Sequence, residues 1–224
     1  MTVLLVLVIF AFFLTLDYLR HRKTEEAAVL ATAAAAEPGA FVPEPVWVAG
    51  YQMPEELHYH RGHTWVRATG PDTAVIGLDD FARRLVGPTD KVRLPAAGTW
   101  LRQGAGAVGL GLGDRTVDLV APVEGEVIET NPLVAGQPGL ATSDPYGRGW
   151  LLKVRTSELG RNLTNLLSGS LARRFMEDSR ERLQHQLMAL SGSVLADGGE
   201  PVADFARHLP AEDWRHLVNE HLLT

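Results

Sequence analysis

The hydrophobic and polar positions divide the chain into four stretches with different patterns. Residues 1–19 are almost wholly apolar, and residues 20–56 change from an Ala-rich, helix-prone run to a Pro-rich linker. Residues 57–160 show short apolar and β-branched runs separated by Gly and Pro, the pattern of strands joined by tight turns. Residues 161–224 return to the spacing of amphipathic helices. The pattern therefore predicts an apolar anchor, a linker, a β domain and a helical C-terminal extension.

The apolar stretch at the N-terminus is interrupted at Asp17 and is followed by Arg20, Arg22 and Lys23. A spanning helix needs roughly 20 apolar residues, with a lower limit of about 17, so residues 1–19 are long enough to cross a bilayer. A cleaved signal peptide or a buried core helix is the alternative, but a signal peptide carries its positive charge before the apolar run. Because basic residues remain on the inner face, we expect a single-pass cell-membrane protein whose soluble domain is cytoplasmic.

Short strands dominate the prediction for the middle of the chain. One helix is expected over Asp79–Val86, and a Pro/Gly-rich loop over Asn131–Gly139. Strands are expected at Thr64–Ala68, Thr73–Leu78, Lys91–Leu94, Trp100–Gly109, Thr116–Val120, Glu126–Glu129 and Gly149–Val154. Several short strands at close spacing indicate a small all-β sandwich or barrel.

The C-terminal extension has apolar positions at helical spacing over residues 163–190, with a possible break near Gly169, and again over residues 211–222. In the last of these helices Trp214 and Leu217 belong to one apolar stripe. Such stripes pack on the β domain or on one another, or they provide a surface for a partner protein. Both interpretations are compatible with the pattern.

Composition excludes several classes of function. The chain has no cysteine, which excludes disulfides, thiol catalysis and Cys-ligated zinc. The formal net charge is −6, so the basic surface typical of a general nucleic-acid binder is missing. We therefore expect no nucleic-acid partner.

A series of motifs carries a family resemblance. The motifs are His63-Thr64-Trp65-Val66, Ala74–Leu78 with Asp80, Leu94-Pro95 with Gly98, Asp118-Leu119 with Ala121-Pro122, Gly125-Glu126-Val127, and Asp144–Leu151. In order and spacing they resemble the glycine cleavage system H protein, a lipoyl-domain family, over Leu57–Glu158. The resemblance implies a mainly β, lipoyl-type barrel–sandwich hybrid, here combined with an N-terminal transmembrane helix and C-terminal helices.

The position of the family's modified lysine is occupied by a different residue. Counted back from Ala121-Pro122, that lysine falls on Asp114, which is flanked by Gly113 and Arg115. The resemblance implies that lipoate is attached there through an amide to a primary amine. A carboxylate cannot form that amide, and a guanidinium that stays protonated is not acylated instead. The lipoylation site is thus expected to be lost, and no cofactor is predicted.

Lysines are scarce in the rest of the chain, which contains only Lys23, Lys91 and Lys153. Lys23 lies beside the predicted membrane span, and the other two match strands of the family outside the hairpin. We expect none of the three to reach the hairpin tip.

Other patterns are weaker. The glycines of Gly104–Gly109 satisfy G-x-G-x-x-G, but a hairpin rather than a helix is expected to follow them, which disfavours dinucleotide binding. His58, His60 and His63 are close in sequence, but no nearby carboxylate or cysteine completes a metal site of a usual kind. No Ser/His or paired-carboxylate arrangement is recognisable. We predict no metal, no catalytic residue and no small-molecule substrate.

These observations favour a non-catalytic, non-lipoylated, membrane-anchored subunit that acts as an accessory or scaffold in a larger membrane-bound complex. Its partners would be other protein subunits and, through residues 1–19, the membrane. Candidate partner-binding residues are Asp114, Arg115, Trp214 and Leu217. The alternative is a carrier protein of a glycine-cleavage-like or related transfer system that is modified at an unexpected residue.

Overall fold

A computed structural model describes residues 44, 46–191 and 209–222. The predicted membrane span at 1–19 and most of the linker at 20–56 lie outside these residues. Within the described ranges, no helix is both long and apolar enough to cross a membrane. The anchor therefore stays a prediction.

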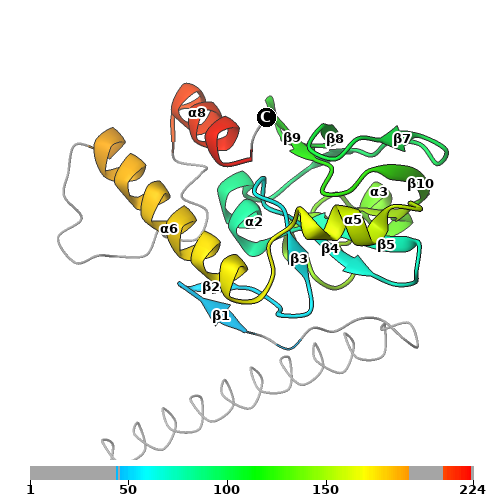
Figure 1. Ribbon diagram of the computed structural model, residues 1–224. Coiled ribbons are helices and arrows are strands. Elements are labelled where there is room, and N and C mark those ends of the chain that lie inside the picture. The colour runs from blue at the N-terminus through cyan, green and yellow to red at the C-terminus, as the bar shows by residue number, and fades with distance from the viewer. Residues whose placement is uncertain (1–43, 45, 192–208, 223–224) are drawn as a thin grey trace, which may run out of the picture. The chain divides into compact units, whose positions relative to one another are not determined.

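Two β-sheets form the centre of the described structure (Figure 1). The larger sheet has the strand order β3 (His58–Tyr59), β4 (Thr64–Ala68), β5 (Thr73–Leu78), β11 (Leu152–Arg155), β10 (Gly125–Thr130), β7 (Trp100–Leu101). The smaller sheet contains β6 (Lys91–Arg93), β8 (Gly106–Leu112) and β9 (Arg115–Val120). All neighbouring strands in both sheets are antiparallel. A short ribbon of β1 (Trp47–Val48) and β2 (Tyr51–Gln52) precedes them.

The alternation of apolar and polar residues along each strand determines which side chains the sheet buries. On β9, Val117 and Leu119 are buried while Thr116 and Asp118 are exposed, as a period of two requires. The buried residues of both sheets belong to one apolar core. The mainly β, lipoyl-type sandwich expected from the sequence is confirmed.

Most of the predicted elements begin and end within one residue of the expected bounds, but the last strand, expected over Gly149–Val154, is β11 at Leu152–Arg155. Strands β4 and β5 are confirmed residue for residue. Helix α2 (Asp80–Val86) begins after Asp79, whose Oδ1 accepts a hydrogen bond from the Ala82 amide at 2.8 Å. This is the N-cap geometry that a short polar side chain favours.

Two predictions about local structure were wrong. The single strand expected over Trp100–Gly109 is divided by a turn at residues 102–105, where Gly104 adopts a φ of +80° that favours glycine. The loop expected over Asn131–Gly139 contains α3 (Pro132–Gly136) and the start of α4 (Leu140–Ser143) at its end. Asn131 caps α3 by accepting the Leu133 amide at 2.9 Å, and Pro132 at the first helical position supports the same start.

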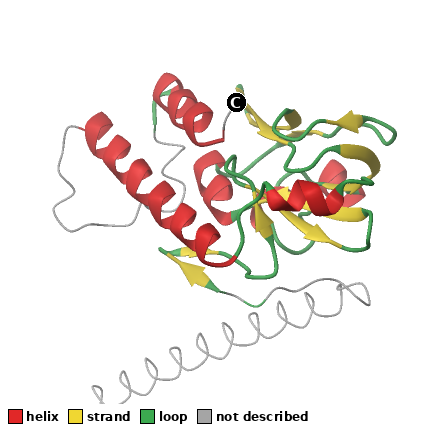
Figure 2. Ribbon diagram, viewed as in Figure 1, coloured by secondary structure: helices red, strands yellow, loops and turns green. Residues whose placement is uncertain are grey.

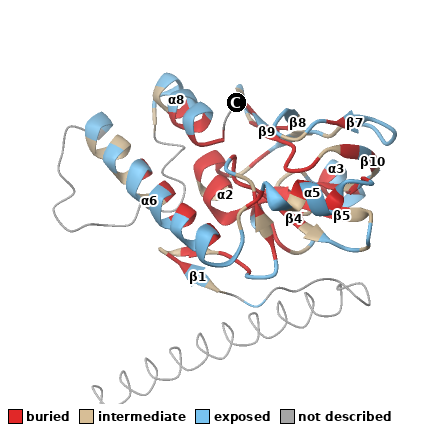
Figure 3. Cartoon of the chain, viewed as in Figure 1, coloured by how far each residue is buried: buried red, intermediate tan, exposed pale blue. Residues whose placement is uncertain are grey.

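The C-terminal extension folds onto the β domain. Helix α5 (Leu159–Thr164) is separated from α6 (Gly169–Ser191) at the expected break, where Gly169 has a φ of +54°. In Figure 2, α2, α6 and α8 (Ala211–Leu222) gather beside the strands, and Figure 3 shows buried residues on α2 and on parts of α6 and α8. The extension contributes to the same core as the strands through Ala172, Met176, Leu183, Trp214, Leu217, Val218 and Leu222.

Trp214 is the largest of these side chains and is only 4% exposed. Its indole Nε1 donates a hydrogen bond to the Leu85 carbonyl at 3.1 Å, which links α8 to the end of α2. Of the two interpretations of the apolar stripe on α8, packing on its own domain is therefore the one that the structure shows for Trp214.

We predict that Trp214→Ala lowers the free energy of unfolding by about 3–5 kcal/mol, because it removes a buried indole and leaves a cavity. Trp100, which is 61% exposed, is the matched control. Its replacement by alanine is expected to change stability by about 0.5 kcal/mol or less. Urea denaturation of both variants measures this, and equal effects would mean that α8 does not share the core.

Candidate functional site

The hairpin between β8 and β9 turns at Gly113 and Asp114. Leu112 pairs with Arg115, so these two residues form the connection. Gly113 has a φ of +63°, which suits a glycine in a tight two-residue turn. Asp114 is exposed at the apex. The outermost side chain of this hairpin is thus a carboxylate.

The turn is held on one side by the start of β6. The Gly113 amide donates to both carboxylate oxygens of Asp90, at 3.2 and 3.1 Å. The Gly113 carbonyl accepts a hydrogen bond from the Lys91 ammonium group. Both backbone polar groups of Gly113 are therefore satisfied from the neighbouring strand.

The prediction that no lysine reaches the tip was wrong for Lys91. The register of β6 on β8 places Lys91 opposite Gly111, two residues before Gly113. Gly111 has no side chain in the way, so the lysine extends along the strand to the turn. Lys153 lies in the other sheet, where its Nζ contacts Glu129 Oε2 at 2.6 Å. Lys91 therefore has the amine nearest the turn among the described lysines.

Arg115 fastens the other side of the hairpin to the C-terminal extension. Its Nη2 donates to the Leu209 carbonyl at 2.8 Å, and its guanidinium lies 5.4 Å from the centre of the Trp214 ring. We call Arg115, Leu209 and Trp214 the C-terminal clasp. Because Trp214 is itself bonded to α2, the clasp ties the hairpin to the helical layer.

The four candidate partner-binding residues have different surroundings. Trp214 and Leu217 are buried inside the chain, with exposures of 4% and 1%. Neither forms part of an exposed surface in this structure. Arg115 is half-buried in the clasp, and only Asp114 is freely exposed.

A buried histidine–aspartate pair lies beneath α2. His63 Nδ1 is 2.8 Å from Asp79 Oδ2, and both residues have no exposed surface. The imidazole stacks on Phe81 at 4.1 Å and meets Phe175 at 4.7 Å. Within the described ranges its Nε2 has no hydrogen-bond partner. Without solvent access, this pair is suited to holding the β3–β4 turn against α2 rather than to proton transfer with a substrate.

The three histidines that are close in sequence, His58, His60 and His63, have separate surroundings in the structure. The Nδ1 atom of His60 accepts the Gly62 amide at 3.0 Å, and burial lowers the pKa of both His58 and His60. Among the described residues, no three histidine, aspartate or glutamate side chains are placed to hold a metal ion. The glycines of residues 104–109 lead into β8 and not into a helix, so the strand–turn–helix of a dinucleotide site is not built there.

His221 on α8 is a buried titratable group that belongs to no motif of the sequence. It is 3% exposed, and its Nε2 lies 2.8 Å from Gln186 Oε1 on α6. Burial is the main cause that lowers its pKa to about 3, and the charges of His63 and Arg182 act in the same direction. The docking of α8 thus requires a neutral imidazole.

Two antiparallel sheets around one core, with a hairpin presented at the surface, define a lipoyl-type β-sandwich domain. The chain belongs to the glycine cleavage H-protein family, whose model matches residues 57–179. The match extends into α6 and does not end at the expected boundary at residue 160.

Individual relatives agree with this assignment. The glycine cleavage system H protein of Mycobacterium avium is 42% identical over 106 residues, which cover 47% of this chain and 80% of the relative. That of Mycobacterium tuberculosis is 36% identical over 126 residues, covering 54% and 94%. A crystal structure of the H protein from Mycobacterium marinum has 27% identity and a TM-score of 0.44, and covers 47% of this chain and 87% of that chain. The family assignment does not depend on this last comparison.

We predict that His221 makes the stability of the protein depend on pH. As pH falls below the ordinary histidine value of 6.5 toward 3, the unfolded chain binds a proton at this residue that the folded chain does not. Stability is therefore complete above 6.5 and decreases on acidification, with a slope of up to about 1.4 kcal/mol per pH unit from this group.

Urea denaturation from neutral pH to about pH 4.5 measures this effect, because the series starts above the ordinary histidine pKa of 6.5 and stays above the folded-state pKa of about 3. His221→Gln keeps a polar group near Gln186 and is expected to remove part of the slope. His216→Gln is the control, because the His216 side chain is 76% exposed. Parallel curves for the wild type and His221→Gln would contradict the assignment.

Proposed function

We propose that this chain is a non-lipoylated member of the H-protein family that serves as an accessory or scaffold subunit of a larger membrane-bound complex. The observation that carries the proposal is the apex of the β8–β9 hairpin. The residue there is Asp114, a carboxylate, whereas the family resemblance implies a lysine at the corresponding position. No amide with lipoate forms at a carboxylate side chain.

The surroundings of the apex support a fixed hairpin. A carrier needs a tip that is free to present its group to successive partners. Here Asp90 and Lys91 bind Gly113 from one side, and the C-terminal clasp binds Arg115 from the other. Hydrogen bonds to charged groups contribute about 1.5–3 kcal/mol when buried and less when exposed, so several together favour one hairpin conformation.

The membrane location rests on the sequence. Residues 1–19 are apolar and are followed by Arg20, Arg22 and Lys23, which favours an uncleaved span with the β domain in the cytoplasm. An anchored domain without a carrier group of its own is suited to holding other proteins at the membrane. No catalytic step is assigned to this domain, because its resemblance to the H-protein family implies a carrier protein and not an enzyme.

We predict that the full chain, solubilised from its own membranes in mild detergent, elutes with other subunits at a mass well above its 24.4 kDa. An alkaline wash of the membranes before extraction is the control for anchoring, since an integral span resists it and peripheral attachment does not. Elution as a free monomer would contradict the scaffold function. Release by the wash would contradict the anchor alone.

A second candidate function is favoured by Lys91. Its amine lies at the turn through the hydrogen bond to the Gly113 carbonyl, and it comes from the strand next to the hairpin. A modified Lys91 would make this chain a carrier of a glycine-cleavage-like or related transfer system. Against this candidate, Lys91 projects from strand β6 and not from the apex of the turn.

An in vitro lipoylation assay separates the two candidates. Purified wild-type chain, Asp114→Lys, Lys91→Arg and Lys153→Arg are incubated with a lipoate–protein ligase, lipoate and ATP, and intact mass is measured. We expect no lipoyl increment on the wild type. Asp114→Lys is expected to gain one lipoyl group, because it places a primary amine at the apex of the β8–β9 hairpin.

An increment on the wild type that disappears in Lys91→Arg but persists in Lys153→Arg would establish the carrier function instead. Failure of Asp114→Lys to be modified would show that more than the lysine has been lost from the hairpin. Gly111, where the resemblance implies a glutamate, is the next position to restore in that case.

A further inference from the structure

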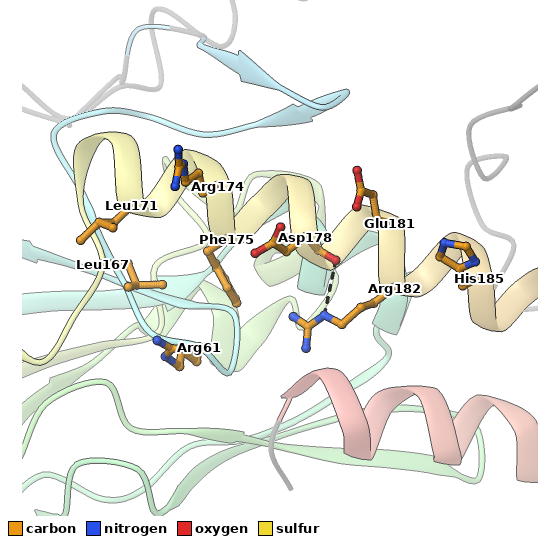
Figure 4. Close-up of a pocket in the computed structure, with 9 residues that line it drawn as sticks. All are labelled: Arg61, Leu167, Leu171, Arg174, Phe175, Asp178, Glu181, Arg182 and His185. Atoms are coloured by element: carbon orange, nitrogen blue, oxygen red, sulfur yellow. Dashed lines mark hydrogen bonds between the residues drawn. The ribbon is translucent and has the colours of Figure 1, made fainter.

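An open groove runs along α6 on the side that faces the β3–β4 turn (Figure 4). Its volume is about 620 Å³. Figure 4 shows Phe175 and Arg182 projecting from α6 toward the side on which Arg61 lies. The groove is lined by Arg61, Leu167, Leu171, Arg174, Phe175, Asp178, Glu181, Arg182 and His185.

One end of the groove is apolar and has a rigid base. Leu167 pairs with Tyr59 through two backbone hydrogen bonds of 2.8 Å, which fix this side of the groove to the larger sheet. Phe175 is 8% exposed and packs against the His63 ring. Leu171, by contrast, is 63% exposed although it lies among these apolar neighbours. A large exposed leucine beside an apolar base is typical of a contact surface.

Two of the arginines around the groove have no ion-pair partner in the part of the chain that the structure describes. Arg61 and Arg174 are exposed, and neither forms an ion pair or hydrogen bond with another described residue. Arg182 is oriented by its own helix, through the Asp178 carbonyl at 3.4 Å and Ser179 Oγ at 3.3 Å. Three guanidinium groups therefore line one groove on a chain whose net charge is −6.

We propose that this groove binds an amphipathic helix of another protein subunit, with an apolar side chain against Leu171 and Phe175 and carboxylates opposite Arg61 and Arg174. The proposal rests on the scaffold function and specifies the surface and the chemistry of its partner. From Leu171 to His185 the groove follows α6 for about 21 Å, the length of about four helical turns. Helix-in-groove binding places apolar anchors at one helical face and polar residues along the rim.

A second copy of this chain fits the groove less well. The apolar residues lie at one end and Glu181 and His185 at the other. A two-fold contact between antiparallel copies of α6 would place the Leu171 end against the charged end of its mate. That arrangement leaves the exposed leucine against charged side chains, without an apolar partner.

An anionic bilayer surface also fits less well. A bilayer contacts protruding surfaces, whereas Phe175 lies at the base of a hollow. Asp178 and Glu181 on the rim would be repelled by anionic headgroups, but they can pair with basic residues of a peptide. The mixed rim therefore favours a protein segment with a defined charge order.

Photo-crosslinking in native membranes tests the proposal with the full chain. Benzoylphenylalanine replaces Leu171 in the groove and, as a matched control, Leu133, which is 47% exposed on α3. Each is combined with Arg61→Glu, Arg174→Glu or the control Arg102→Glu, which alters an exposed arginine outside the groove. Cross-linked peptides are identified by mass spectrometry.

We expect a protein adduct at position 171 and not at 133, mapped to an amphipathic segment that carries carboxylates. Arg61→Glu and Arg174→Glu should reduce the adduct about tenfold, and Arg102→Glu should leave it unchanged. Changing the facing carboxylate of the mapped segment to lysine should restore the adduct with Arg174→Glu. This charge exchange supports the proposal in a way that capture alone does not.

An adduct with lipid, with a second copy or with another segment of the same chain would overturn the proposal. So would the absence of an adduct, or one that is insensitive to both charge reversals. If the protein still co-elutes with other subunits in those cases, the scaffold function stands and only the groove is excluded. If it elutes alone, the scaffold function itself has failed.

Discussion

The packing of α8 against the β8–β9 hairpin is the interaction on which the rest of the account depends. Trp214 inserts between α2 and the hairpin, with its ring under the Arg115 guanidinium and its Nε1 bonded to the Leu85 carbonyl. An aromatic ring that is both buried and hydrogen-bonded holds its position strongly, and the cation–π contact adds roughly 0.5–2 kcal/mol. The hairpin that defines this fold is thereby joined to the last helix of the chain.

That connection supports the role proposed for the hairpin tip. In the family that this chain resembles, the hairpin tip is expected to carry an attached mobile group. In this chain its apex is Asp114, and the residues on either side are engaged by β6 and by the C-terminal clasp. A surface that is fixed in this way is better suited to a permanent interface than to visiting several enzymes. The groove on α6 then offers a second, separate surface on the same compact unit.

Short sequence patterns were sufficient to predict the helices and strands whose start, end and spacing are encoded by neighbouring residues. Strands β4 and β5 follow from alternation and from the turn between them, and α2 follows from Asp79 as a cap and the apolar spacing after it. The short strands with Gly/Pro turns indicated a mainly β fold, and the family motifs specified its lipoyl type. By contrast, α3 was missed because Asn131-Pro132 is compatible with either a loop or a capped helix start.

The site could be predicted less completely, because its contacts are non-local. Lys91 reaches the turn only through the register of β6 on β8, which no short pattern encodes. The stripe around Trp214 has the same spacing whether it packs on its own domain or on a partner, so burial could not be decided in advance. His63 and Asp79 are sixteen residues apart and meet only when α2 folds over the β3–β4 turn.

The central claim is that the hairpin carries no attached group in the cell. The most direct test is the intact mass of the full chain purified from its own membranes, with peptide mapping of residues 90–116. We expect the unmodified mass of the sequence and unmodified peptides that contain Lys91 and Asp114. A lipoyl or other acyl increment localised to Lys91 would contradict it and would identify the chain as a carrier.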